Sequence, residues 1–249
     1  MRAILLAAGR GRRLGALAQQ GPKCMVIVEG QPLLKRTLQG LIVCGVKEII
    51  LVVGYQQEKI EAFLESEKDL TSKAHIVTVE NPDFTQGNIL SLWCSAAYFD
   101  SDLLIMDADV YFDFALLKHL IESLLKDCFL LDSGFQHTGE EVVLMTRQGR
   151  VLDLEKIEKL PTGYDLLGET VGFLKLSKEN ASLLKEILQE MVSAGLTGLE
   201  YEQAYRLLVQ KIPIGFEEVK NLFWMEIDFE EDLAKLHTAL MATRRQPHA

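Results

Sequence analysis

Short apolar runs alternate with amphipathic stretches along the first half of the chain. Continuous apolar runs with the length of buried strands occupy residues 2–7, 48–53, 75–79 and 102–106. Between these runs, apolar residues recur at helical spacing in residues 32–43, 57–64 and 89–98. Because strands that alternate with helices form right-handed βαβ units, this order predicts an α/β fold with a mostly parallel mixed sheet flanked by helices.

The pattern is less regular in the second half of the chain. Residues 140–147 and 149–157 predict a β-hairpin that projects from the sheet as a small lid or as an arm for homodimer formation. Further strands are expected at 129–132 and 171–176, and helices at 114–125, 180–192, 199–209 and in a last segment ending at 240. We therefore expect a single domain over residues 1–240, with 132–170 as an insertion that carries the hairpin, and a C-terminal tail over 241–249.

The composition of the chain bears on its size class, its partners and its compartment. The chain has 249 residues and is 48% hydrophobic, which suffices for one large domain, and no apolar run reaches the length of a membrane span. The net charge of −10 argues against nucleic acid as a partner, since a phosphate backbone demands a basic protein face. The N-terminus lacks the layout of a signal peptide and the four cysteines are scattered, so we expect a cytoplasmic protein with reduced thiols.

The chemistry of the chain changes abruptly after the first predicted strand. Glycines and arginines alternate there, at Gly9, Arg10, Gly11, Arg12, Arg13 and Gly15, and the segment ends at Pro22-Lys23. A Gly-rich loop after a buried strand lets backbone N–H groups approach a phosphate, and arginines can bind phosphate oxygens in pairs. No Gly-Lys-Ser/Thr follows, and the third glycine of a dinucleotide fingerprint is missing. The segment therefore predicts a triphosphate cradle, with a solvated basic turn as the alternative.

Two acidic residues follow the fourth predicted strand. Asp107 and Asp109 are expected to project the same way from an extended chain, and burying such acids without a cation is costly. Carboxylate oxygens suit Mg²⁺, so this pair predicts a magnesium site. The alternative is an acidic turn that caps the next helix, for which Asp113 is the better candidate.

Side-chain amides follow the third predicted strand. In this segment Gly87 would let a planar base approach the backbone, and the amide of Asn88 is suited to a pyrimidine edge, with Gln86 beside it. In the alternative, Asn88 is only a helix cap and Ser91 a neutral first-turn residue.

These segments together resemble those of the nucleotidyltransferases that join a nucleoside triphosphate to a phosphorylated small molecule. The loop pattern of that family, L-A-A-G-x-G-x-R followed by P-K, is matched by residues 6–13 and 22–23. Residues 81–92 resemble the Asn-x-x-Phe-x-x-x-Asn-x-x-Ser-Leu segment of the phosphocholine and 2-aminoethylphosphonate cytidylyltransferase branch. Glu226-Ile227-Asp228 resembles the Glu-Ile-Asp element near the end of these transferases, and the alternative for Asp228 is a helix cap.

The resemblance implies a single Rossmann-like nucleotidyltransferase domain that joins CTP to a small phosphate or phosphonate acceptor with release of pyrophosphate. It assigns catalytic roles to Lys23 and Arg13, and a Mg²⁺ cofactor to Asp109 and Asp228 with Asp107 as a helper. The residues expected to bind the nucleotide are Leu6, Ala7, Ala8, Gly9, Arg10, Gly11, Gln86, Gly87, Asn88 and Ser91. The residues expected to bind the acceptor are Asn81, Tyr164, Glu169, Glu202 and Trp224.

Several alternatives stay open at this point. The acceptor could be phosphocholine, 2-aminoethylphosphonate or an inositol phosphate; a quaternary ammonium favours an aromatic cage, whereas a primary amine favours carboxylates. A sugar-1-phosphate enzyme that uses CTP, UTP or dTTP is the alternative function. A nucleotide-binding module without catalysis is the alternative of a different class, and an NAD-dependent oxidoreductase is disfavoured by the missing glycine.

Overall fold

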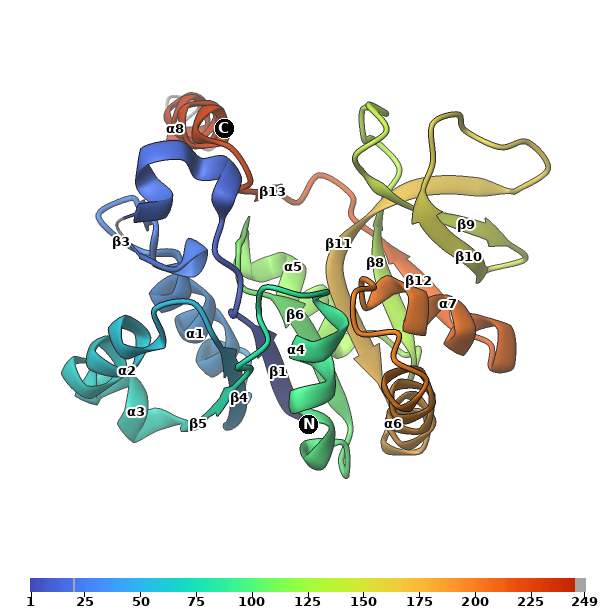
Figure 1. Cartoon of the computed structure of the whole chain (residues 1–249). Coiled ribbons are helices and arrows are strands. Elements are labelled where there is room, and N and C mark those ends of the chain that lie inside the picture. The colour runs from blue at the N-terminus through green and yellow to red at the C-terminus, as the bar shows by residue number, and fades with distance from the viewer. Residues whose placement is uncertain (20, 245–249) are drawn as a thin grey trace.

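The computed structural model describes residues 1–19 and 21–244. Within these residues, nine strands form one mixed sheet, in which the parallel set β6-β1-β4-β5 extends to one edge. The bounds of these strands are β1 Arg2–Leu6, β4 Glu48–Val53, β5 His75–Glu80 and β6 Leu103–Asp107. The expected alternation of strand and helix is confirmed, and the carboxyl ends of the four strands share one edge of the sheet (Figure 1).

Helices cover both faces of the sheet. One face packs against α1 (Leu33–Val43), α2 (Gln57–Ser66), α3 (Lys68–Lys73) and α5 (Phe114–Glu122). The other face packs against α4 (Ile89–Cys94), α6 (Lys178–Ser193) and α7 (Glu202–Lys211). Strand β1 is buried on both faces of the sheet. Ala3 and Leu5 lie in one hydrophobic core and Ile4 lies in the other, and all three are fully buried.

The second half of the chain extends this sheet. The long strand β11 (Leu166–Leu176) is antiparallel to β6 at its end, and to β9 (Val142–Arg147) at its start. Strand β9 forms a hairpin with β10 (Arg150–Lys156), and β11 also pairs with β8 (Cys128–Asp132), which is parallel to β12 (Gly215–Glu218). The predicted hairpin exists, but it is part of the main sheet and not a separate projecting arm, because β9 pairs with β11 over four residues.

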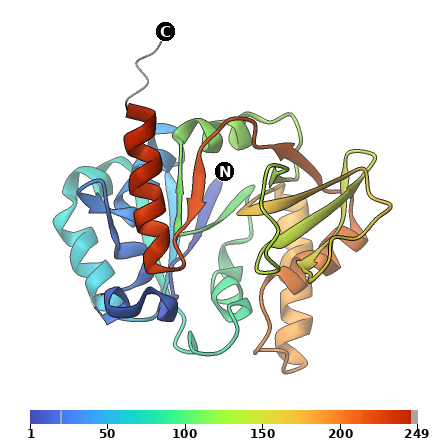
Figure 2. The ribbon, with the colours of Figure 1, turned by 90° about the horizontal axis from the view of Figure 1, so that it is seen from above.

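Small elements complete the fold at the carboxyl edge of the central strands. They comprise η1 (Arg12–Gln19), η2 (Lys23–Met25), the pair β2 (Ile27–Val28) and β3 (Gln31–Pro32), and the pair β7 (Val110–Phe112) and β13 (Trp224–Glu226). At the opposite edge, η3 (Ala96–Tyr98) contacts Arg2 at the start of β1. The last helix, α8 (Glu230–Arg244), lies on one side of this edge and the β9–β10 hairpin lies on the other (Figure 2). The predicted tail starts later than expected, since 241–244 are helical, and 245–249 lie outside the described residues.

Two further properties bear on the class of protein. In the described part of the chain, every helix is too short or too polar to cross a lipid bilayer. All four cysteines are free thiols, and Cys24 and Cys128 are buried in the core.

Candidate active site

A cavity of about 300 Å³ opens at the carboxyl edge of the sheet, between η1 and β13 on one side and the β9–β11 strands on the other. Nine carboxylates and three cationic side chains line it. The carboxylates are Asp107, Asp109, Glu140, Glu141, Glu169, Glu200, Glu202, Glu226 and Asp228, and the cations are Arg13, Lys23 and Lys156. The cavity is therefore strongly acidic, with its few basic groups gathered mainly at the Gly/Arg loop.

The Gly/Arg loop follows β1 as predicted. Gly9 is exposed with open space beside it, whereas Gly11 has a φ of +63° and lies so close to Lys23 that a Cβ would approach the Lys23 side chain to 3.1 Å. Arg13 lines the cavity, whereas the guanidinium of Arg10 stacks 5.2 Å from the Tyr55 ring, outside the lining of the cavity. Of the loop arginines, it is Arg13 that the fold directs to the acidic cluster.

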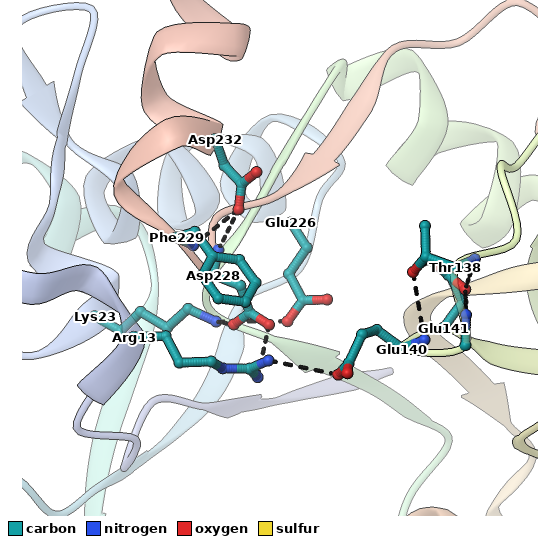
Figure 3. A network of polar contacts seen from close by, with 10 residues as sticks. Arg13, Lys23, Thr138, Glu140, Glu141, Glu226, Asp228, Phe229 and Asp232 are labelled. Carbon is teal, nitrogen blue, oxygen red and sulfur yellow. Dashed lines mark hydrogen bonds and ion pairs between the residues drawn. The ribbon is translucent and has the colours of Figure 1, made fainter. Parts of the chain in front are cut away.

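Lys23 lies at the centre of that cluster. Its side chain is 10% exposed, and Nζ lies 2.5 Å from Asp109 Oδ2 and 3.4 Å from Glu226 Oε1. Nζ also donates to Asp228 Oδ1, and Arg13 pairs with Asp228 Oδ2 at 2.7 Å (Figure 3). Burial alone would lower the pKa of Lys23, but the three carboxylates outweigh it and raise the pKa above its usual value.

The β7–β13 pair explains how these distant residues meet. Glu226 opposes Val110 in this antiparallel pair, and the Ile227 N–H donates to the Asp109 carbonyl oxygen at 3.0 Å. Asp228 then follows Ile227, two residues after the end of the strand. The alternative role of Asp228 as a helix cap is not seen, because Asp232 accepts the N–H groups of Asp228 and Phe229 at 3.1 and 2.8 Å.

The cluster of Asp109, Glu226 and Asp228 fits a hard divalent cation. Each of the three offers an oxygen, and these oxygens lie within 4.8 Å of one another. In addition, Asp109 Oδ1 is buried without a hydrogen-bond partner. Glu226 was not expected from the sequence, although it stands two residues before Asp228, at the end of a strand.

Asp107 is not part of this cluster. The strand β6 ends at Asp107, and Ala108 and Asp109 form a turn, so the alternation of an extended chain that we assumed for the two acids breaks between them. The Asp107 Oδ2 atom accepts a hydrogen bond of 2.5 Å from the hydroxyl of Tyr201. Burial, and next the charge of Asp109, raise the pKa of Asp107 well above its usual value. The structure thus gives Asp107 a different partner from the one that we expected.

A second cavity of about 190 Å³ adjoins the first along a shared wall of Asn88, Asp107, Asp109 and Tyr201. Six of the residues predicted to bind the nucleotide line it, namely Leu6, Ala8, Gly9, Gln86, Asn88 and Ser91. Ala7 is buried beneath the loop, and Arg10, Gly11 and Gly87 lie outside the lining of both cavities.

In the 86–91 segment, Gly87 differs from its expected environment, and the alternative role of Asn88 as a side-chain cap is not seen. Gly87 faces protein and not an open base site, because a Cβ there would overlap the Leu199 carbonyl oxygen. Asn88 does not cap α4 with its side chain; its Oδ1 accepts the Tyr201 N–H at 2.6 Å.

The five residues predicted to bind the acceptor divide into two groups. Glu169 and Glu202 line the first cavity. Asn81, Tyr164 and Trp224 do not line it. Asn81 is 1% exposed and donates to Ser91 Oγ, Trp224 Nε1 donates to Asp132 Oδ2, and the Tyr164 ring lies against Arg147. These three side chains are occupied by internal contacts, which the sequence pattern did not reveal.

Burial perturbs the two acids that do line the cavity. It raises the pKa of Glu202 to about 7, and together with the Glu141 and Asp132 charges it raises the pKa of Glu169 to about 7. The Glu202 Oε2 atom is buried without a hydrogen-bond partner within the described chain. On the β9 side, hydrogen bonds from Thr138 outweigh burial and lower the pKa of Glu141 to about 2, so that acid stays ionised. The cavity therefore has unmet capacity to accept hydrogen bonds.

Sequence comparisons find relatives that match most or part of this chain. The chain is 27% identical over 244 residues to a bifunctional IPC transferase and DIPP synthase of Aquifex aeolicus, covering 97% of this chain and 52% of that protein. It is 26% identical over 233 residues to a choline-phosphate cytidylyltransferase of Streptococcus pneumoniae, covering 84% and 96%. A CMP-5′-(3-aminopropyl)phosphonate synthase of Streptomyces rubellomurinus is 36% identical over 120 residues, which are 48% of this chain and 19% of that protein. The chain thus spans about half the length, or less, of two of these relatives.

Solved structures show the same architecture. The CTP:phosphocholine cytidylyltransferase of Streptococcus pneumoniae superposes with a TM-score of 0.79 at 21% identity, covering 96% of this chain and 98% of that chain. The inositol-1-phosphate CTP transferase of T. maritima superposes with a TM-score of 0.77 at 20% identity, covering 100% and 97%. The family model of the MobA-like NTP transferase domain matches residues 3–202, so the chain belongs to this nucleotidyltransferase family.

Proposed function

We propose that this protein is a cytidylyltransferase that joins CTP to a small phosphonate or phosphomonoester bearing a primary ammonium group. The observation that carries the proposal is the acidic cavity beside a second cavity lined by the residues predicted to bind the nucleotide. Relatives whose names specify cytidylyl transfer to phosphocholine and to aminoalkyl phosphonates support the reaction class.

In this reaction an acceptor oxygen attacks the α-phosphorus of CTP, the bond to the β-phosphate oxygen breaks, and pyrophosphate leaves. The ionised acceptor oxygen is itself a nucleophile, so catalysis consists of positioning and of charge stabilisation. Lys23 would contact the α-phosphate, Arg13 the β- and γ-phosphates, and the backbone at Gly9 would lie along them. Both cations are already directed into the site by their pairing with Asp228.

The three clustered carboxylates would hold Mg²⁺ in this account. Asp109, Glu226 and Asp228 supply the oxygens, and the unpartnered Asp109 Oδ1 marks unused capacity. When bound, Mg²⁺ neutralises part of the negative charge on the phosphates of the triphosphate.

The lining of the first cavity favours a primary ammonium over a quaternary one. A quaternary ammonium has no N–H to donate and is bound by a cage of aromatic rings. Among the described residues that line this cavity, Tyr201 and Phe229 alone are aromatic, whereas nine carry carboxylates. A primary ammonium donates three hydrogen bonds, for which carboxylates are strong acceptors. Glu202, with its buried unpartnered Oε2, and Glu169 are the proposed partners.

An inositol phosphate is the second candidate acceptor. A relative whose name includes IPC transferase matches 97% of this chain, and ring hydroxyls can also donate to carboxylates. The two acceptors differ in charge, since the inositol ring carries no cation.

Initial rates of pyrophosphate release test this proposal. CTP, UTP, dTTP, ATP and GTP are each combined with 2-aminoethylphosphonate, phosphocholine, inositol 1-phosphate and glucose 1-phosphate in the presence of Mg²⁺. We expect the highest kcat/KM with CTP and 2-aminoethylphosphonate. We also expect Glu202→Gln to raise the KM for that acceptor by ~10-fold or more, as for a lost charged hydrogen bond. The matched control is Glu190→Gln on the exposed face of α6.

Other outcomes redirect the proposal in defined ways. A preference for glucose 1-phosphate or for UTP would contradict it. Binding of CTP without pyrophosphate release from any pair would favour a nucleotide-binding module.

A further inference from the structure

The segment that leads into α7 is joined by hydrogen bonds to the turn that follows β5. The Gly87 N–H donates to the Thr197 carbonyl oxygen at 3.0 Å, and the Ile89 N–H donates to that of Leu199 at 3.2 Å. The Thr197 hydroxyl donates to Gln86 Oε1 at 2.9 Å. The Tyr201 N–H donates to Asn88 Oδ1 at 2.6 Å. We call this contact between residues 86–89 and 197–201 the seam.

Gly87 makes the close approach of the two segments possible. A Cβ at this position would overlap the backbone of Gly198 and Leu199, so no larger residue fits without separating the two segments. The seam is therefore a backbone-to-backbone contact with side-chain hydrogen bonds at both ends.

The two sides of the seam reach different cavities and meet in their shared wall. Gln86 lines the cavity assigned to the nucleoside. Glu200 and Glu202 line the acidic cavity assigned to the acceptor, and Asn88 and Tyr201 line both. Thr197 and Gly87 line neither cavity. An effect of these two residues on substrate binding would therefore be indirect.

We propose that the seam couples the two substrate sites, so that CTP bound against residues 86–89 fixes residues 200–202 in the position that receives the acceptor. Ordering one segment lowers the cost of ordering the other, because the hydrogen bonds of the seam hold the two together. By linkage, the acceptor tightens CTP by the same factor as CTP tightens the acceptor. Thr197 and Gly87 are positioning residues in this inference, which rests on the proposed function.

Hydrogen exchange with CTP alone gives the first test. We expect CTP to slow amide exchange in residues 197–201 of the full-length chain, as well as in residues 86–89. If CTP binds and residues 197–201 are unaffected, the coupling is overturned while the proposed function stands. If CTP does not bind, the proposed function fails and the coupling fails with it.

Calorimetry gives the second test. The affinity for 2-aminoethylphosphonate is measured with and without α,β-methylene-CTP, and the ratio is the coupling factor. We expect a factor of ~5 or more in the wild type, and a clearly smaller factor in Thr197→Val, which keeps the shape of the side chain but loses the hydroxyl. Thr238→Val is the matched control, because the Thr238 hydroxyl donates to the Ala234 carbonyl oxygen within α8. This variant should keep the wild-type factor.

Gly87→Ala is the stronger variant of the same test. It should lower the coupling factor further, with an increase in the acceptor KM that exceeds any decrease in kcat. Because Gly87→Ala can also impair folding, the decision rests on Thr197→Val. An unchanged coupling factor in Thr197→Val, or a wild-type factor of one, overturns the inference.

Discussion

The Nζ atom of Lys23 lies 2.5 Å from the Oδ2 atom of Asp109, although 86 residues separate them in the chain. The same Nζ contacts two further carboxylates, Glu226 and Asp228. A lysine at the centre of three acids connects the Gly/Arg loop to the proposed metal ligands. Its charge is held between the groups that would bind Mg²⁺ and the space that the triphosphate would occupy.

Replacement of Lys23 should strongly lower turnover without unfolding the protein. We expect Lys23→Ala to lower kcat by ~10²-fold or more, because a fixed cation that stabilises developing charge is lost. Lys35→Ala is the matched control, since Lys35 also forms an ion pair, 2.6 Å from Glu67, but on α1 away from the cavities. Steady-state rates together with a thermal unfolding curve check both points, and a Lys23→Ala enzyme within about tenfold of wild type would remove this residue from the mechanism.

Measurements of metal affinity should distinguish the role of Glu226 from that of Asp107. Glu226→Gln and Asp109→Asn should each weaken the binding of Mn²⁺, used as a probe for Mg²⁺, because both carboxylates belong to the cluster. Asp107→Asn should bind Mn²⁺ like the wild type, since Asp107 is paired with Tyr201. Electron paramagnetic resonance of free Mn²⁺ measures the affinity without any turnover. Loss of binding in Asp107→Asn but not in Glu226→Gln would reverse our assignment.

The pH dependence of acceptor binding should report Glu202. Burial raises its pKa from 4.5 to about 7, and only the ionised form pairs with an ammonium, so affinity for the acceptor should rise with pH through about 7 and level off above it. The ionisation of the acceptor itself is common to wild type and Glu202→Gln, so the difference between their profiles isolates the contribution of Glu202. Parallel profiles would contradict this role.

The same raised pKa predicts an effect on stability. Because the folded protein holds this proton more tightly than the unfolded chain, the contribution of Glu202 to stability is complete below pH 4.5 and is lost as the pH rises through about 7. Denaturant unfolding at several pH values should therefore show a shallower decline for Glu202→Gln than for wild type. An equal decline in both proteins would show that Glu202 titrates normally.

Two glycines with positive φ give a matched test of the Asp107 environment. Gly172 has a φ of +80°, and a Cβ there would overlap the Asp107 carboxylate, whereas Gly195 has a φ of +76° with nothing within 4 Å. Gly195→Ala should cost ~1 kcal/mol through backbone strain alone. Gly172→Ala should cost ~2 kcal/mol or more, because it also displaces the Asp107–Tyr201 pair. Equal losses in the free energy of unfolding would show that Asp107 moves aside freely.

Much of the site could be predicted from the sequence because its parts follow strands. The loop after β1 and Asp109 after β6 each stand where an apolar run ends, and parallel strands bring such ends to one edge. Asp228 also follows a strand, β13, which reaches this edge through its antiparallel pairing with β7. The alternation of strands and helices likewise followed from hydrophobic periodicity.

The remaining features depend on contacts between distant segments. The contact of Gly87 with Leu199 requires the position of the segment that leads into α7, which no local pattern encodes. The pairing of Asn81 with Ser91 depends on how the chain folds between β5 and α4. Glu226 joins the cluster only because β13 pairs with β7. The hairpin of β9 and β10 was expected to project, but the unusually long β11 gives β9 an edge to pair with.

Phosphorus NMR of one competition mixture tests the central claim most directly. The mixture contains equal CTP, UTP, ATP and GTP, together with equal 2-aminoethylphosphonate, phosphocholine, inositol 1-phosphate and glucose 1-phosphate, with Mg²⁺ and the enzyme. The account predicts that CTP and 2-aminoethylphosphonate disappear together, while signals of pyrophosphate and of a new phosphonate–phosphate anhydride appear. Consumption of another nucleotide, or of an acceptor without a primary ammonium group ahead of 2-aminoethylphosphonate, would contradict it.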